Sequence, residues 1–247
     1  MKKFVAIITL IMVFAASSFA GFEISVFGGY TTVAMTKVNK EIDTIVDALG
    51  PLPSSVKLTK NHITQGFIIG SNIGYSPIPG LLIGPQIEML LGINGLIDVK
   101  DESTGDFIKY EFSSSLIPIL GGLSYMISLP GSSFSIGGGA YFGYGLASAA
   151  MKASVKFGAY TVNNEAKFEG GCFTADIIAK AKMAVTPLIS VGLQIGYRLA
   201  NVAQMKATED NAAMGLTKGD VLKDTNGDDL PFDFGGLIAA LDIGFSF

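Results

Sequence analysis

The sequence contains no tryptophan, and among its 247 residues it has a single cysteine and a single histidine. Because Cys172 is the only cysteine, no internal disulfide can form, and other interactions must hold the fold together. After the first 20 residues, no stretch reaches the roughly 18 uninterrupted apolar residues of a membrane-spanning helix. Mean hydropathy is nevertheless high, at +0.48, because apolar residues recur in alternating segments that glycines interrupt.

The chain is also short of positive charge. Without the two lysines of residues 1–20, 15 basic residues face 21 acidic ones, a net charge of −6. A nucleic-acid-binding surface needs a local excess of basic residues, so this balance argues against a nucleic-acid partner.

The first 20 residues show the pattern of a secretory signal peptide. Lys2 and Lys3 give a basic start, residues 4–15 are almost wholly apolar, and residues 18–20 form an A-x-A-like cleavage site. The apolar run is shorter than the ~20 residues that a spanning helix needs, which argues against a membrane anchor. We predict a cleaved signal peptide over residues 1–20 and one mature domain over residues 21–247.

The last sixteen residues, 232–247, contain the clearest strand pattern in the chain. From Leu237 onward, apolar and mostly small or polar positions alternate, and a period of two places successive side chains on opposite faces of a strand. The apolar face comprises Leu237, Ala239, Leu241, Ile243, Phe245 and Phe247. The other face comprises Ile238, Ala240, Asp242, Gly244 and Ser246.

A strand of this kind, with aromatic residues at the third-last and last positions, resembles the closing strand of bacterial outer-membrane β-barrels. The resemblance implies that Phe245 and Phe247 form the signal that the barrel-insertion machinery recognises. It also implies an aromatic girdle, which tyrosine and phenylalanine must supply because tryptophan is absent.

Seven further segments have strand-like alternation. The eight expected strands cover about 22–36, 63–75, 81–93, 107–128, 134–147, 172–185, 188–199 and the terminal 232–247. Short turns at 77–80, 129–133 and 186–187 alternate with polar loops at 37–62, 94–106, 150–171 and 201–231. A short helix is expected over 38–49, and the 150–171 loop is expected to extend a hairpin with Asn163-Asn164 at its tip.

This alternation of short turns and long loops is typical of outer-membrane barrels. The predicted fold is all-β: an eight-stranded antiparallel up-and-down transmembrane β-barrel with short periplasmic turns and long extracellular loops. As a pattern along the whole mature chain, it resembles the small barrels that include the OmpA transmembrane domain, OmpX, OmpW and opacity proteins. The alternative is a soluble periplasmic barrel with its apolar face turned inward as a core.

If the apolar face meets lipid, charged residues line the lumen. The predicted lumen charges are Glu88, Asp176, Lys180, Lys182, Arg198 and Asp242. An eight-stranded barrel is just wide enough for side chains to fill, and buried charges must pair, so we expect an ion-paired, plugged interior. The alternative is a narrow conduit, because many glycines share the inner face.

The sequence gives little support for catalysis. His62, the only histidine, lies at a predicted loop edge without a recognisable triad, so we expect no enzyme activity. Asp224, Asn226 and Asp228 resemble the start of a calcium loop, which makes residues 224–233 a candidate divalent-cation site. The glycine and glutamate positions of an EF-hand are missing. No other cofactor is indicated.

These features predict a monomeric protein of the bacterial outer membrane, with membrane lipid and the barrel-insertion machinery as partners. Its expected role is structural or surface-interacting, with long acidic loops outside and an unidentified extracellular partner or small solute. The alternative is an OmpW-like narrow channel or lateral-exit transporter for small or hydrophobic molecules. A soluble periplasmic binding module is a distant alternative.

Overall fold

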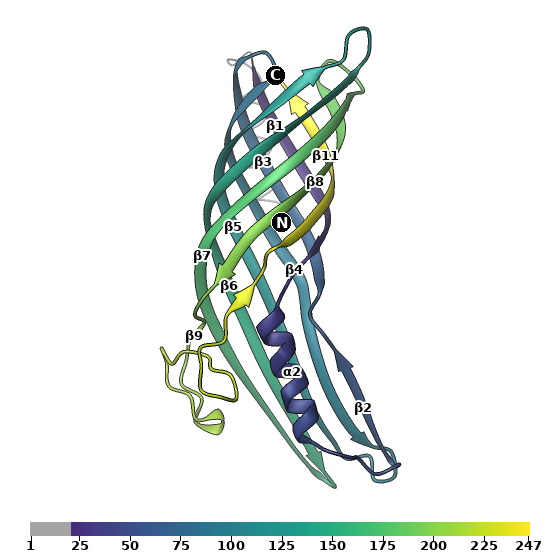
Figure 1. Cartoon of the computed structure of the whole chain (residues 1–247), viewed down its shortest axis with the longest axis vertical. Helices are drawn as coiled ribbons and strands as arrows, with labels where there is room; N and C mark the ends of the chain where they lie inside the picture. Colours follow the sequence, from purple (N-terminus) through teal and green to yellow (C-terminus); the bar gives the residue numbers. More distant parts are fainter. Residues whose placement is uncertain (1–20) are drawn as a thin grey trace.

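The computed structural model describes residues 21–247, so the predicted signal peptide lies outside the described residues. Eight strands form one closed antiparallel ring, in which β11 pairs with both β8 and β1 (Figure 1). The ring strands are β1 (Phe22–Thr32), β3 (Gln65–Ile78), β4 (Leu81–Asp101), β5 (Phe107–Ser128), β6 (Phe134–Phe157), β7 (Tyr160–Ala184), β8 (Ile189–Val202) and β11 (Gly236–Ser246). The predicted eight-stranded barrel is confirmed.

The remaining elements are short and lie at one end of the barrel. They are helix α2 (Thr36–Ala48), strand β2 (Val56–Asn61), strand β9 (Lys206–Ala207), the 3-10 turn η1 (Ala212–Met214) and strand β10 (Phe232–Asp233). Among the described residues, no helix is long and apolar enough to cross a membrane.

The barrel wall carries apolar side chains outward. In β11, Leu237 and Leu241 are 58% and 69% exposed, whereas the residue that follows each of them, Ile238 and Asp242, is buried. The same period of two continues on the other ring strands, because successive side chains of a strand face opposite sides. An apolar belt of this size is foreign to a soluble monomer, so the barrel has the surface of a membrane protein and not that of the soluble alternative.

The predicted 94–106 loop is largely strand, and the hairpin extension predicted within 150–171 is present and longer than expected. β4 extends to Asp101 and β5 begins at Phe107, while β6 extends to Phe157 and β7 begins at Tyr160. Residues 94–101 and most of 150–171 therefore continue the sheet. The polar composition that suggested loops instead reflects the water-exposed outer face of these extensions. The tip of the β6–β7 hairpin lies at Gly158, with φ 59°, and Asn163 pairs with Ser154 farther back.

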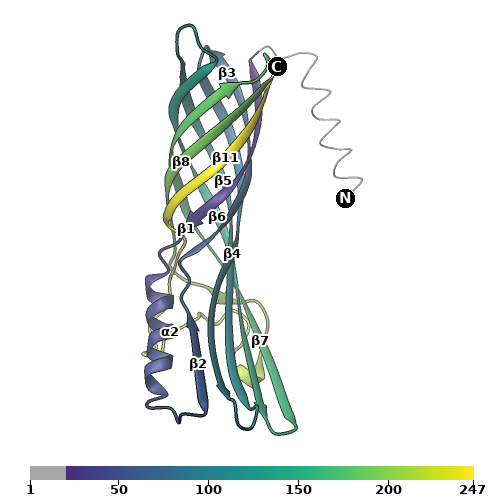
Figure 2. The ribbon, with the colours of Figure 1, turned by 90° about the vertical axis from the view of Figure 1, so that its right-hand side faces the viewer.

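These extensions, together with the segments that pack on them, form a second body beyond the barrel, which we call the head. It comprises residues 33–64, 93–114, 149–170 and 203–235. Figure 2 shows α2 beside β2, with β4 and β7 running on to the far end of the molecule. β2 adds to the edge of the β4 extension, from Val56 opposite Asp101 to Asn61 opposite Leu96.

The head has its own apolar core. Helix α2 contributes Val38 and Ile42, both buried, and its observed bounds agree with the helix predicted over 38–49. The sheet and the 203–235 segment supply most of the remaining core. These residues include Ile63, Ile93, Ile97, Phe112, Phe168, Val202, Met205, Leu222, Leu230, Phe232 and Phe234. Much of the predicted 201–231 loop is therefore a segment that packs into the head core.

A bulge in β4 joins the two bodies. On the barrel side of the bulge, Glu88 and Leu90 face inward and Leu91 faces outward. On the head side, Ile93 and Ile97 face inward. The pairing of β4 with β5 shifts between Leu90 and Ile93, and Gly92 there has φ 71°, a conformation that glycine adopts without strain. Strict alternation along the predicted strand 81–93 would put Ile93 on the outer face with Leu91. That expectation is wrong, because the extra residue of the bulge exchanges the two faces of the strand.

Candidate functional site

The middle of the barrel lumen is crossed by one buried cation. The Arg198 guanidinium, fully buried, donates through Nε to Asp176 Oδ1 at 2.8 Å and through Nη2 to Asp176 Oδ2 at 2.6 Å. Nη2 also contacts Glu88. Asp176 lies on the neighbouring strand, whereas Glu88 lies on β4, four strands from β8 in either direction round the ring. The Arg198–Glu88 ion pair therefore bridges opposite walls.

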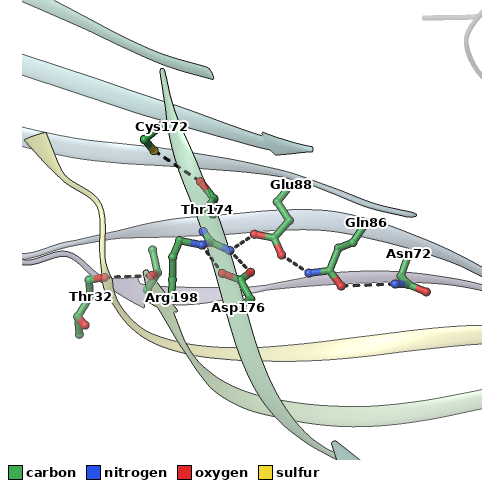
Figure 3. Close-up of polar contacts among 9 residues, drawn as sticks. Thr32, Asn72, Gln86, Glu88, Cys172, Thr174, Asp176 and Arg198 are labelled. Atoms are coloured by element: carbon green, nitrogen blue, oxygen red, sulfur yellow. Dashed lines mark hydrogen bonds and ion pairs between the residues drawn. The ribbon is translucent and has the colours of Figure 1, made fainter. Parts of the chain in front are cut away.

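Neutral amides extend this layer (Figure 3). Gln86 Nε2 donates to Glu88 Oε1, and Asn72 Nδ2 lies 3.5 Å from Gln86 Oε1. Both amide side chains are buried. The sequence analysis missed Asn72, although its alternation with the apolar residues of β3 was the signal that could have found it. Because two carboxylates on different strands share one guanidinium, the layer links opposite walls of the lumen.

A second polar group lies nearer the turn end of the barrel. Lys182 forms an ion pair with Glu23 and lies 3.9 Å from Asp242 Oδ2. Lys180, almost fully buried, donates to the Tyr141 hydroxyl at 3.3 Å and lies 5.2 Å from the centre of that ring. All six predicted lumen charges thus lie inside the barrel, in two groups centred on Arg198 and Lys182.

The two ends of the lumen differ in character. At the turn end it opens into a cavity of about 230 Å³, whose lining includes Glu23, Lys180, Lys182 and Phe247. At the head end the inward positions become apolar: Leu90 follows Glu88 along β4, and Leu90 and Leu116 are fully buried. The head core continues from there. The polar lumen is therefore bounded at the head end by a layer of buried apolar residues among the described residues.

The predicted cation loop makes an ordinary turn. Asp224 Oδ1 accepts hydrogen bonds from the backbone amides of Asn226 at 2.9 Å and Asp228 at 3.0 Å. Burial acts to raise the pKa of Asp224, but these donated hydrogen bonds outweigh it and lower the pKa below its ordinary value. Thr225 is held by Glu41 of α2. In residues 21–247, no three His, Cys, Asp or Glu side chains are grouped to hold a metal ion, and the cation site stays a prediction.

His62 fastens the helix of the head to the sheet. Its Nε2 lies 2.9 Å from Asp43 Oδ1 on α2, and Lys60 Nζ of β2 lies 2.6 Å from the same oxygen. The hydrogen bonds from Lys60 and His62 lower the pKa of Asp43. Cys172, the single cysteine, is buried with its Sγ 3.6 Å from Thr174 Oγ1.

The chain terminus closes the ring. Phe247 donates its amide to the Phe22 carbonyl at 2.8 Å, and its own carbonyl accepts from the Gly21 amide at 2.9 Å. Phe245 lies on the outer face of β11, in register with Ile24 of β1. The two predicted assembly residues therefore lie at the seam between the first and last strands.

No protein-family model matches the chain, and no curated protein sequence matches it. Several solved structures are similar in fold. The outer membrane protein OprG from Pseudomonas aeruginosa is 14% identical, with 93% of this chain and 97% of that one covered at a TM-score of 0.43. Neisserial surface protein A is 12% identical, with 92% of this chain and 98% of that one covered at a TM-score of 0.34. The outer membrane protease OmpT from Escherichia coli is 10% identical, covers 92% and 97%, and gives 0.40.

Proposed function

We propose that this chain is a monomeric protein of the bacterial outer membrane that anchors a folded head at the cell surface and conducts no solute. The observation that carries the proposal is the layer of buried apolar residues between the polar lumen and the packed head. Barrel strands continue directly into the head, so the head is held rigidly to its anchor. We assign no enzymatic activity to it.

The outer face of the sheet marks where the membrane would end. Four cross-strand rows follow one another from barrel to head, each fixed by the registers of β4 to β7. They are Ile119–Tyr144–Phe173, then Ile117–Leu146–Gly171, then Ser115–Ser148–Glu169, then Asn94–Ser113–Ala150–Lys167. Apolar rows thus give way to hydroxyl and charged rows within one step, which is the profile of a lipid–water boundary.

The closed lumen favours an anchor over a channel. A conducting path would have to break the Arg198–Glu88 bridge and then cross the apolar layer at Leu90 and Leu116. A lateral exit would need a break in the wall, whereas the described strands pair all the way round the ring. The alternative of a channel or lateral-exit transporter therefore has less support.

Cysteine labelling in intact cells tests location and orientation together. In a Cys172→Ser background, Tyr160→Cys at the head tip should react with a membrane-impermeant maleimide, and Ser133→Cys at the turn end should react only after lysis. Equal labelling of both positions in intact cells would contradict the proposal. Planar-bilayer recording of the purified protein should show no stepwise conductance, and reproducible steps would revive the channel.

The terminal seam makes a separate proposal testable. We expect deletion of Phe247 to reduce assembly into the outer membrane without blocking export, because the insertion machinery would lose its recognition signal. Fractionation should then show unfolded protein in the periplasm. Phe157→Ala, which removes an exposed aromatic residue of the head tip, is the matched control and should assemble normally. Normal membrane levels of the Phe247 deletion would contradict the assembly role.

A further inference from the structure

A band of small polar residues lies on the head side of the apolar belt, and its outer surface is hollowed. Three hollows follow one another round the outside of the sheet, of about 390, 350 and 930 Å³. The first two share Asn94 and Ser113, and the last two share Glu169 and Thr208. Because neighbouring hollows share lining residues, we treat the three together and call them the belt-edge groove, which extends from β2 and β4 to the 203–229 segment.

The floor of the belt-edge groove is made of side chains that are short and polar. Ser115 and Ser148 lie opposite each other, with their hydroxyl oxygens 2.8 Å apart. Ser113 and Asn94 add a hydroxyl and an amide in the next row. Short side chains let a flat, hydroxyl-bearing ring approach the sheet, and the serine and asparagine groups can both donate and accept hydrogen bonds there.

Each hollow has at least one lysine and at least one carboxylate. Glu111 lines the first hollow, Glu169 lines the second and third, and Asp229 also lines the third. Lys152 lines the first, Lys167 the second, and Lys206 and Lys218 the third. The ion pairs of Lys152 with Glu165 and of Lys167 with Glu209 are both long, at 3.7 Å, and lie at exposed side chains. Exposed pairs of this kind are weak, so these ammonium groups can turn to an incoming anion.

We propose that the belt-edge groove binds the anionic sugar headgroup of a lipid in the surrounding leaflet. The inference rests on the proposed function, because it needs the apolar belt to lie in a membrane. The acyl chains would lie along Tyr144, Leu146 and Phe173. All three side chains are strongly exposed on the barrel side of the Ser115–Ser148 row. Phosphate groups would meet the lysines and sugar hydroxyls would meet the serines. Tyr144 belongs to both surfaces, since it also lines the third hollow.

Lipid retention by the purified protein tests this proposal. The protein is refolded into phosphatidylcholine nanodiscs that contain either lipid A or phosphatidylglycerol, and bound lipid is counted by native mass spectrometry after detergent release. The groove should retain lipid A in preference to phosphatidylglycerol, which has the charge without the sugar. Ser115→Leu with Ser148→Leu fills the groove floor and should weaken lipid A retention roughly fivefold or more, as expected when several hydrogen bonds are lost.

A charge variant and a matched control complete the experiment. Lys167→Glu with Lys206→Glu should weaken lipid A retention at least as much, and added salt should reduce the difference. Ser154→Leu, on the same outer face of β6 but farther from the belt, should leave retention unchanged. Equal retention of the two lipids, or equal loss in Ser154→Leu, would overturn the groove. Failure to insert into pure phosphatidylcholine discs would instead count against the proposed function.

Discussion

The barrel and the head use the same strands with opposite interiors. In the barrel, Arg198, Asp176 and Glu88 fill the inside while leucine and phenylalanine cover the outside. In the head, Ile42, Ile97 and Phe112 fill the inside while lysine, glutamate and serine cover the outside. The difference teaches that the surroundings, and not the sheet itself, decide which face is polar: lipid surrounds one body and water the other.

The strands change environment in two ways. In β5, β6 and β7 the alternation of inward and outward residues continues unbroken from barrel to head, and only the residue types change. On the outer face of β5, for example, Ile117 is followed by Ser115 toward the head. β4 changes faces instead, through the bulge at Gly92. A bulge is needed where the apolar residues of one strand must meet lipid in one body and the core in the other.

The largest expected effect comes from the barrel interior. Arg198→Ala leaves Asp176 and Glu88 as buried carboxylates without their cation, and should lower the free energy of unfolding by about 3–5 kcal/mol. Urea unfolding in lipid bilayers measures this loss. It is followed by far-UV circular dichroism, because the chain has no tryptophan for fluorescence. The triple change Arg198→Leu, Asp176→Leu and Glu88→Leu should recover much of this loss. A triple variant as unstable as Arg198→Ala would show that the polar interior itself is required.

The head should lose stability separately from the barrel. Ile42→Ala removes a fully buried side chain between α2 and the sheet, and should cost roughly 2–5 kcal/mol in the head. Hydrogen exchange should show α2 and the β4 extension opening while β8 and β11 stay protected, and the heat-modifiable gel mobility should be retained. Leu241→Ala, on the lipid-facing side of β11, is the control. Simultaneous loss of protection in β11 would mean that the two bodies unfold as one.

The joint between the bodies should be sensitive to one residue. Gly92→Val places a β-branched side chain at φ 71° and close to the Phe67 ring, at a strain cost of about 1–3 kcal/mol. Thermal unfolding should shift downward, with the increased exchange centred on residues 90–95. Gly121→Val, at an outer position of β5 with open space around it, should have little effect. Equal shifts in both variants would contradict a special role for the bulge.

The smallest expected effect is the attachment of α2 by Asp43. Its pKa lies below the ordinary 3.8 because Lys60 and His62 bind the carboxylate. A lowered pKa in the folded state means that the contribution is fully present above the unfolded value and is lost as pH falls through the folded one. Exchange of α2 amides should therefore rise below about pH 4. In Asp43→Asn this rise should be absent, and an unchanged pH dependence would assign it to another group.

The sequence by itself determined the barrel. Alternation along strands such as 237–247 requires only that neighbouring side chains face opposite sides, and that rule is local, so the strand number and the inward position of Arg198 and Glu88 could be read in advance. β5 has the predicted bounds, 107–128.

Only the tertiary structure decided the rest. The partners of Arg198, the packing of α2 and the 203–235 segment, and the strand character of residues 94–101 depend on contacts between positions far apart in the chain. A polar stretch has the same composition whether it is a loop or the wet face of a strand, and the difference appears only when a buried partner such as Ile63 or Phe112 covers its other side. The groove above the belt likewise exists only because four strands place their small residues in adjacent rows.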